Sequence, residues 1–272
     1  MNTTTMTSRK SGFAREINAV ITIAAREITL MIKAPAMIII SLVIPIIMMG
    51  LVGSMLSQSI AGVLSFDYGP YMMIGMMVIM LFMTVSMGML TLVDESTADF
   101  MQEIMVSPIS RYSIVIGKMI GASFGSILCS LGALIVGLFM GITISSDGLL
   151  RFLALSPLMC LSGGAMAIFI IGLIKSKGAA NIVVMVITIP QMFLCGAFIP
   201  ISNSSGILLV LSRLMPMTYC LDLVRAVVYA GTSEYDNIVL FNPAINLAAI
   251  LTLSIAFLII GTFFFARTEK KR

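Results

Sequence analysis

The sequence predicts an all-α polytopic membrane protein with six transmembrane helices, and two observations lead to this fold class. First, 59% of the 272 residues are hydrophobic and only 10% are charged, whereas a soluble domain carries about 25% charged residues. Second, six stretches without Asp, Glu, Lys or Arg reach the length of about 20 residues that a helix needs to cross the hydrocarbon core. This composition excludes a soluble enzyme, a disordered chain and a nucleic-acid-binding domain, despite a net charge of +4.

The six charge-free stretches set the topology. We predict spans at about 36–56, 70–92, 119–143, 152–174, 179–201 and 243–265. An even number of crossings places both termini on one side of the membrane. On that side lie 13 of the 16 Lys and Arg residues, and positive residues accumulate in cytoplasmic loops. We therefore expect a multi-pass protein of the inner or plasma membrane with cytoplasmic N- and C-termini.

The chain is accordingly divided into one membrane domain and two cytoplasmic ends. The predicted parts are an N-terminal segment at 1–33, a transmembrane domain at 34–268 and a basic tail at 269–272.

Residues 12–33 precede the first span, and their pattern predicts an amphipathic helix. Apolar residues recur at helical spacing, at Phe13, Ile17, Val20, Ala24, Ile28 and Met31. The other face carries Arg15, Thr22, Arg26, Thr29 and Lys33. Such a helix lies in the membrane interface with its basic face toward anionic head groups. The alternative is a solvated lead-in to the first span.

The cytoplasmic segment 93–118 is longer than a connection requires. Ser96 and Asp99 form a capping-box pattern just before apolar residues, and Pro108 stops a helix at the residue before it. We therefore predict a helix at 97–106 with Phe100 and Ile104 on one face. The alternative is a capped connector that touches nothing, but apolar side chains exposed to water usually mark a docking surface.

The outer segment 202–242 contains two helical pieces, each too short to span. Pro216 separates them, and Gly231 ends the second. We predict a re-entrant hairpin that dips into the outer leaflet, in which Asp222 and Arg225 pair because they lie three residues apart. The alternative is a surface helix held at the head groups by Tyr219 and Tyr229.

The glycines of the third span predict a close helix contact. Gly117, Gly121 and Gly125 recur every four residues, and such a stripe lets another helix approach closely. Packing within one subunit is favoured over a dimer interface.

Several kinds of catalytic site are excluded by residue types that the chain lacks. It contains no His, so it has no Ser/His/Asp triad and no His-based zinc site. Its four Cys residues show no C-x-x-C spacing, and no G-x-x-x-x-G-K-[ST] loop occurs. We therefore expect no catalytic residues, no metal site and no cofactor bound by this chain.

Two separated motifs resemble those of one transporter family. The stretch from Asp99 to Arg111, followed by Gly117 and Lys118, resembles the cytoplasmic loop of ABC-2-type permeases, most closely in the drug- and daunorubicin-resistance branch. The stretch from Leu214 to Tyr219, followed by Asp222, Arg225 and Gly231, resembles the segment before the last span in that family. The resemblance covers roughly residues 15–268, and the chain differs from many members at Ser96 and Asp99.

The resemblance implies a role and partners. It implies the permease subunit of an ATP-binding-cassette exporter, with a second permease subunit, most simply in a homodimer, and a separate ATPase subunit that binds ATP and Mg. The residues implied in coupling to that subunit are Glu95, Asp99, Phe100, Glu103, Ile104, Pro108 and Arg111. Those implied in the outer re-entrant segment are Pro216, Tyr219, Asp222 and Arg225.

Two other functions compete with a permease, namely a membrane-embedded enzyme and an ion-coupled carrier. The enzyme needs polar catalytic groups at depth, and the carrier usually needs an intramembrane ionisable residue or inverted repeats. The predicted spans contain no His and no carboxylate for an enzyme. They also contain no charged residue and show no inverted repeat for a carrier. Spans without charge suit a hydrophobic or amphipathic substrate, such as a drug or a lipid, and we expect membrane lipids but no nucleic acid as further partners.

Overall fold

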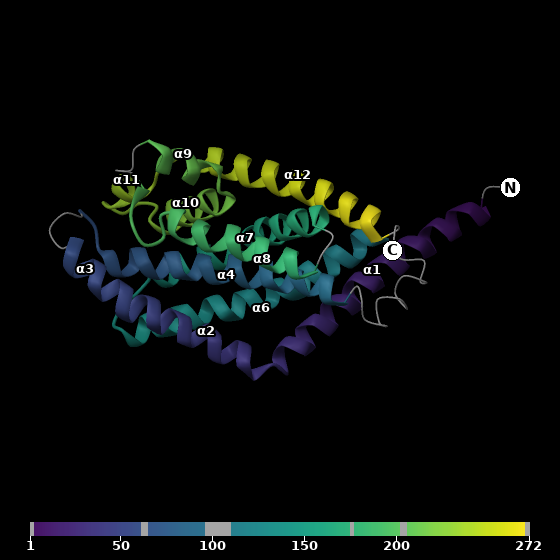
Figure 1. Ribbon diagram of the computed structural model, residues 1–272, viewed down its shortest axis with the longest axis horizontal. Coiled ribbons are helices and arrows are strands. Elements are labelled where there is room, and N and C mark those ends of the chain that lie inside the picture. The colour runs from purple at the N-terminus through teal and green to yellow at the C-terminus, as the bar shows by residue number, and fades with distance from the viewer. Residues whose placement is uncertain (1–2, 61–64, 96–109, 175–176, 202–205, 270–272) are drawn as a thin grey trace.

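The computed structural model describes residues 3–60, 65–95, 110–174, 177–201 and 206–269, and within these ranges the regular secondary structure is helical, without strands. This confirms the all-α fold class. The helices form an elongated bundle in which the start of α1 and the end of α12 lie at one end, and α3, α9 and α11 lie at the other (Figure 1).

The described elements follow the chain in this order: α1 (Thr3–Ile32), α2 (Pro35–Ile47), the π-helical turn η1 (Met48–Gly53), α3 (Ser54–Ile60), α4 (Tyr68–Glu95), α6 (Arg111–Phe139), α7 (Ser146–Leu173), α8 (Lys177–Leu194), α9 (Ile207–Leu214), α10 (Pro216–Val228), α11 (Tyr235–Ile238) and α12 (Pro243–Glu269).

Helix α4 is the centre of the bundle. It packs against α6, α7, α8 and α10. In its most apolar stretch, 78% of the residues are buried, compared with 22% in the corresponding stretch of α12. Its core positions include Met73, Met76 and Met77, all fully buried. Methionine is unbranched and adaptable, so these side chains fill the irregular spaces between four neighbouring helices.

Five described helices are long and apolar enough to cross a membrane: Leu42–Ser59, Tyr68–Leu92, Arg111–Phe139, Ser146–Leu173 and Pro243–Phe265. They overlap five of the six predicted spans. The remaining prediction, 179–201, is helical only as far as Leu194, at the end of α8. Gly196 follows with a φ of +84°, a left-handed conformation that commonly ends a helix.

The outer segment contains the two short helical pieces that the sequence predicts. Helices α9 and α10 meet at Met215 with a bend of 83°, which fits either a broken span or a re-entrant segment. Helix α10 is buried against α7 and α12, whereas Ile207, Leu208 and Leu214 of α9 are exposed. The proline at the first position of α10 forces this break, because it supplies no backbone N–H and restricts the residue before it.

The glycine stripe of α6 is covered by α1 of the same chain. An added Cβ at Gly117 would lie 2.9 Å from the Val20 carbonyl oxygen, and one at Gly121 would lie 3.0 Å from the Ala24 carbonyl oxygen. The stripe therefore acts within one subunit, as the sequence favoured. One side of α1 is consequently buried, while Ile17, Ile21 and Ile32 on a neighbouring side remain exposed.

This contact predicts the effect of adding one methyl group to the stripe. Gly121→Ala places a Cβ against the backbone of α1, and overpacking of this kind costs about 1–3 kcal/mol. We expect a lower midpoint of thermal unfolding for the purified protein in detergent. Gly178→Ala is the matched control because nothing lies within 4 Å of its added Cβ. Equal midpoints for the two variants would show that α1 does not lie tightly on α6.

Candidate functional site

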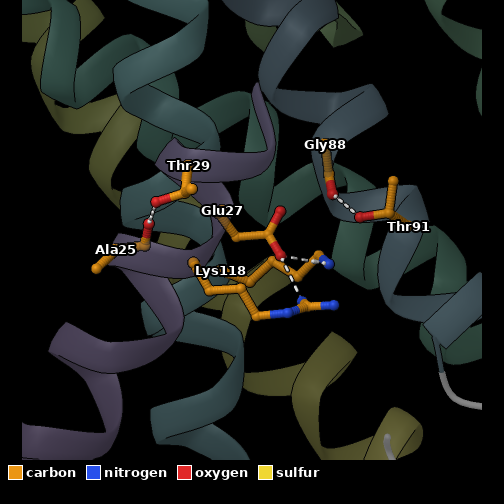
Figure 2. Close-up of polar contacts among 7 residues, drawn as sticks. Ala25, Glu27, Thr29, Gly88, Thr91 and Lys118 are labelled. Carbon is orange, nitrogen blue, oxygen red and sulfur yellow. Dashed lines mark hydrogen bonds and ion pairs between the residues drawn. The ribbon is translucent and has the colours of Figure 1, made fainter. Parts of the chain in front are cut away.

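A buried ion pair joins α1 to α6 beside the glycine stripe. The Lys118 ammonium donates to Oε1 of Glu27 at 3.0 Å, and the Arg26 guanidinium donates to the same oxygen at 3.1 Å (Figure 2). The Lys118 side chain is 1% exposed and that of Glu27 is 13% exposed. An ammonium group at this depth needs a counter-charge, because burying an unpaired charge is strongly unfavourable. Glu27 therefore fixes the position of α1 along α6.

A second carboxylate of α1 holds the start of α6. Both oxygens of Glu16 accept from the backbone N–H of Ser110, at 3.0 and 3.1 Å. Ser110 is the N-cap of α6, and its hydroxyl accepts from the backbone N–H of Tyr112 at 3.2 Å. Negative charge is favourable next to a helix N-terminus. Helix α1 thus contacts the end of the segment that resembles the permease loop.

These two acids of α1 were not among the predicted site residues. Glu16 and Glu27 lie eleven residues apart, about three turns of an α-helix, so they share one face. The predicted amphipathic helix rests on the apolar and basic residues of this segment and not on its acids. Two acids on one face of an otherwise apolar and basic helix were the signal that pointed to partners on another helix.

The predicted coupling residues lie mostly outside the described part of the chain. This applies to Asp99, Phe100, Glu103, Ile104 and Pro108, and also to the helix predicted at 97–106. The described helices bracket the segment, since Glu95 is the last residue of α4 and Arg111 is the first residue of α6.

A cavity of about 220 Å³ adjoins the ion pair between α1, α4 and α6. Its lining includes Glu27, Met31, Thr84 and Thr91. The Thr91 hydroxyl donates to the Gly88 carbonyl at 2.8 Å (Figure 2). Oxygen atoms therefore line one part of this cavity, and apolar side chains line the rest.

Asp222 and Arg225 do not form the predicted pair with each other. Asp222 bonds to groups at the start of α12, whereas Arg225 bonds to groups near the end of α8 and on α4. Asp222 accepts from the backbone N–H groups of Leu240 and Phe241, at 2.8 and 2.9 Å, and from the Asn246 amide at 2.7 Å. Leu240 and Phe241 lie in the link directly before α12, and Asn246 lies in the first turn of α12. The buried carboxylate supplies the acceptors that buried N–H groups require.

Arg225 satisfies carbonyl groups at the end of α8. Its guanidinium donates to the Gly196 carbonyl at 3.0 Å and to the Tyr71 carbonyl at 3.3 Å. It also lies over the Tyr71 ring, 3.6 Å from the ring centroid. The Tyr71 hydroxyl donates to the same Gly196 carbonyl at 2.6 Å. Arg225 therefore joins α10, α4 and the turn after α8 at the end of the bundle that lies opposite the termini.

The other two predicted outer residues lie at the bend between α9 and α10. Pro216 is the first residue of α10. The Tyr219 hydroxyl donates across the bend to the Arg213 carbonyl at 2.7 Å. The Thr218 hydroxyl does the same to the Ser212 carbonyl at 2.6 Å. These bonds add acceptor contacts at the end of α9, where the Ser212 carbonyl also accepts from the Met215 backbone N–H at 3.2 Å.

The buried ion pair predicts a pattern of stabilities. Glu27→Gln takes the Glu27 carboxylate away from the buried Lys118 ammonium, and breaking a buried pair in this way costs about 3–5 kcal/mol. Adding Lys118→Met to Glu27→Gln removes that charge, so we expect the double variant to recover most of the lost thermal stability. Both are measured as unfolding midpoints in detergent.

The control is Asp147→Asn, which breaks the pair with Arg151, whose side chains are 68% and 39% exposed. An exposed pair contributes only about 0–1 kcal/mol, so we expect a small shift. If the Glu27→Gln variant were as stable as Asp147→Asn, the claim that this ion pair fixes α1 along α6 would be wrong.

Comparison with known proteins identifies the family of the chain. The family model described as ABC-2 type transporter matches residues 18–229. No curated protein sequence matches the chain. The matched region begins in α1 and ends directly after α10, so it contains both the ion pair of Glu27 with Lys118 and the Arg225 contacts. The protein belongs to the ABC-2 type transporter family.

Proposed function

We propose that this chain is the permease subunit of an ATP-driven exporter for a hydrophobic or amphipathic substrate of the drug or lipid type. The observation that carries the proposal is the family match over residues 18–229, in a chain whose described part forms a bundle of long apolar helices. The loop motif resembles the drug-resistance branch of this family. A path between apolar helices favours a substrate with a large hydrocarbon surface.

The energy source is a partner subunit. The chain contains no G-x-x-x-x-G-K-[ST] loop with which to cradle a nucleotide. Membership of the family implies partnership with an ATP-binding subunit. ATP and Mg are bound there, and this chain contributes docking and the membrane path rather than catalysis.

The docking surface is the segment between α4 and α6. Phe100 and Ile104 enter a groove of the ATPase subunit, with Glu103 at its rim, and Glu95 and Arg111 flank the segment. A displacement of this segment reaches α6 directly, since α6 begins at Arg111. It reaches α1 as well, because Glu16 is bonded to Ser110. A displacement of the segment between α4 and α6 therefore moves α1 and α6 together.

The arrangement of the ends supports the proposed topology. The beginning of α1 and the end of α12 lie at one end of the bundle (Figure 1), as expected if both face the cytoplasm. We assign the sixth crossing to α8, an apolar helix that is shorter than the five candidate spans. One chain provides half of the transport path, and a second copy provides the other half.

The test is coupled ATP hydrolysis. The chain is co-expressed with its partner cassette ATPase, and the complex is purified and reconstituted in liposomes. We expect a stable complex whose ATPase activity rises with an amphipathic drug. Phe100→Ala should release the ATPase subunit or abolish the stimulation, since loss of an aromatic anchor at an interface costs about 2 kcal/mol or more.

Phe139→Ala is the matched control, because Phe139 is 89% exposed at the last residue of α6, the end remote from the loop. It should leave assembly and stimulation unchanged. Normal assembly and transport in a combined Phe100→Ala, Ile104→Ala and Glu103→Lys variant would contradict the docking role. ATP hydrolysis by the isolated chain would contradict the proposal that only the partner subunit binds and hydrolyses ATP.

A further inference from the structure

The break between α1 and α2 leaves an apolar cavity against α6. Helix α1 ends at Ile32 and α2 begins at Pro35, and the two helices form a V whose apex points away from the bundle (Figure 1). A cavity of about 240 Å³ lies between these two helices and α6. Its described lining residues are Met31 and Ile32 of α1, Leu42 of α2, and Leu128, Cys129, Gly132 and Ile135 of α6.

This cavity opens toward the membrane. Ile32, Leu128 and Ile135 line it and are nevertheless 61%, 44% and 46% exposed, and the last two belong to the candidate span Arg111–Phe139. Its described lining has no charged, hydroxyl or amide side chain. Water occupies a cavity only where polar partners hold it, and an apolar cavity of about 150 Å³ stays dry and binds benzene. Lipid hydrocarbon is therefore the material that fills this one.

The cavity has the direction and the length of part of an acyl chain. Leu128 and Ile135 lie seven residues apart, which is about 10 Å along α6 at 1.5 Å per residue. Half of the hydrocarbon core measures about 15 Å. Because α6 is long and apolar enough to cross the membrane, a chain beside it runs in the same direction as the neighbouring lipids. The cavity thus holds much of one acyl chain and leaves the head group outside.

Lys33 supplies a cation at the mouth of the cavity. It follows the lining residue Ile32 directly, at the apex of the V, and its side chain is exposed. Among the described residues no carboxylate pairs with it, and the nearby Glu27 is bonded to Lys118. A lysine on a membrane-facing surface lays its stem on apolar side chains and holds its ammonium among the polar head groups. A lipid phosphate is the anion that meets it there.

We propose that this cavity and Lys33 together bind one phospholipid with an anionic head group. One acyl chain lies between Leu42 and Gly132, and the phosphate pairs with the Lys33 ammonium. A zwitterionic head group would bring its own cation to the same place, so the anionic lipid binds more tightly. The bound lipid fills the V and fixes the angle between α1 and α2. It stays with the protein, and the assignment does not depend on the proposed transport function.

Quenching of a single tryptophan by brominated lipid tests the proposal. The chain contains no Trp, so Ile39→Trp gives one reporter on α2, one turn before Leu42. The full chain is reconstituted in phosphatidylcholine nanodiscs with increasing fractions of phosphatidylglycerol dibrominated on its acyl chains. We expect quenching that saturates at a low fraction. Ile255→Trp on α12 is the matched control, since Ile39 and Ile255 are 60% and 52% exposed, and its quenching should rise in proportion to the fraction.

Three variants in the Ile39→Trp background test the two parts of the site. Lys33→Gln should raise the phosphatidylglycerol fraction at half-maximal quenching about fivefold, the effect of one cation on an anionic lipid. Arg267→Gln is its matched control, because it removes the same charge from an exposed residue of α12, which does not line the cavity. Gly132→Leu fills the cavity from α6 and should remove the saturating phase. Leu42→Phe narrows it from α2 and should weaken that phase, so the cavity is tested even if one of the two variants fails to fold.

Each part of the proposal has a result that would overturn it. Proportional quenching of Ile39→Trp, as in Ile255→Trp, would show that no lipid site exists here. Equal saturation by dibrominated phosphatidylcholine, or an unchanged midpoint in Lys33→Gln, would overturn the anionic head group. Full saturation in the folded cavity-filling variants would overturn the cavity as the place of the acyl chain. No ATPase subunit or transport substrate is used, so a failure of the proposed transport function would leave these results unaffected.

Discussion

The Lys118 ammonium lies within the contact between two helices and has a carboxylate of the other helix beside it, 3.0 Å away. The arrangement of the termini-bearing end of the bundle depends on this interaction. A buried ammonium is tolerated only with a partner, so α1 cannot slide or rotate on α6 without exposing that charge. The glycine stripe allows the two backbones to approach closely enough for Glu27 to reach it. The cavity beside the pair, the position of Met31 and the contact of Glu16 with Ser110 all follow from this register.

The opposite end of the bundle is organised by the same kind of constraint, applied to the backbone. Helix α8 stops at Leu194, and α12 begins at Pro243. A helix end that is buried in an apolar bundle has no water with which to satisfy its carbonyl and N–H groups. Arg225 and Asp222, both on α10, supply the missing donors and acceptors. Helix α10 therefore joins the turn after α8 to the start of α12, which explains why it is buried although it carries two charges.

Much of the fold follows from composition and short-range pattern. The absence of charge over about 20 residues indicated the spans, and the spacing of Gly117, Gly121 and Gly125 indicated a close helix contact. The bend at Pro216 could be expected from proline alone.

Other features depend on which distant residues meet. The proximity of Asp222 and Arg225 in sequence predicted a pair, but each side chain has better partners at a helix end that lies far away along the chain. Local pattern likewise marked Lys118 as a cytoplasmic charge, and only the packing of α1 shows that it is buried. The end of α8 at Leu194 likewise depends on distant residues. The Gly196 carbonyl just after it accepts from Tyr71 on α4 and from Arg225 on α10.

The central claim is that α1 and α6 form one rigid unit that receives motion from the loop between α4 and α6. The most direct measurement is a distance between spin labels at Thr22 and Tyr112, both of which are exposed on these two helices. It is made in the complex with the ATPase subunit, without nucleotide and after vanadate trapping, with a second label pair that joins Tyr112 to the ATPase subunit. We predict that the second distance changes between the two states, whereas the distribution of distances between Thr22 and Tyr112 stays the same. A shift or broadening of the distribution between Thr22 and Tyr112 would contradict the account.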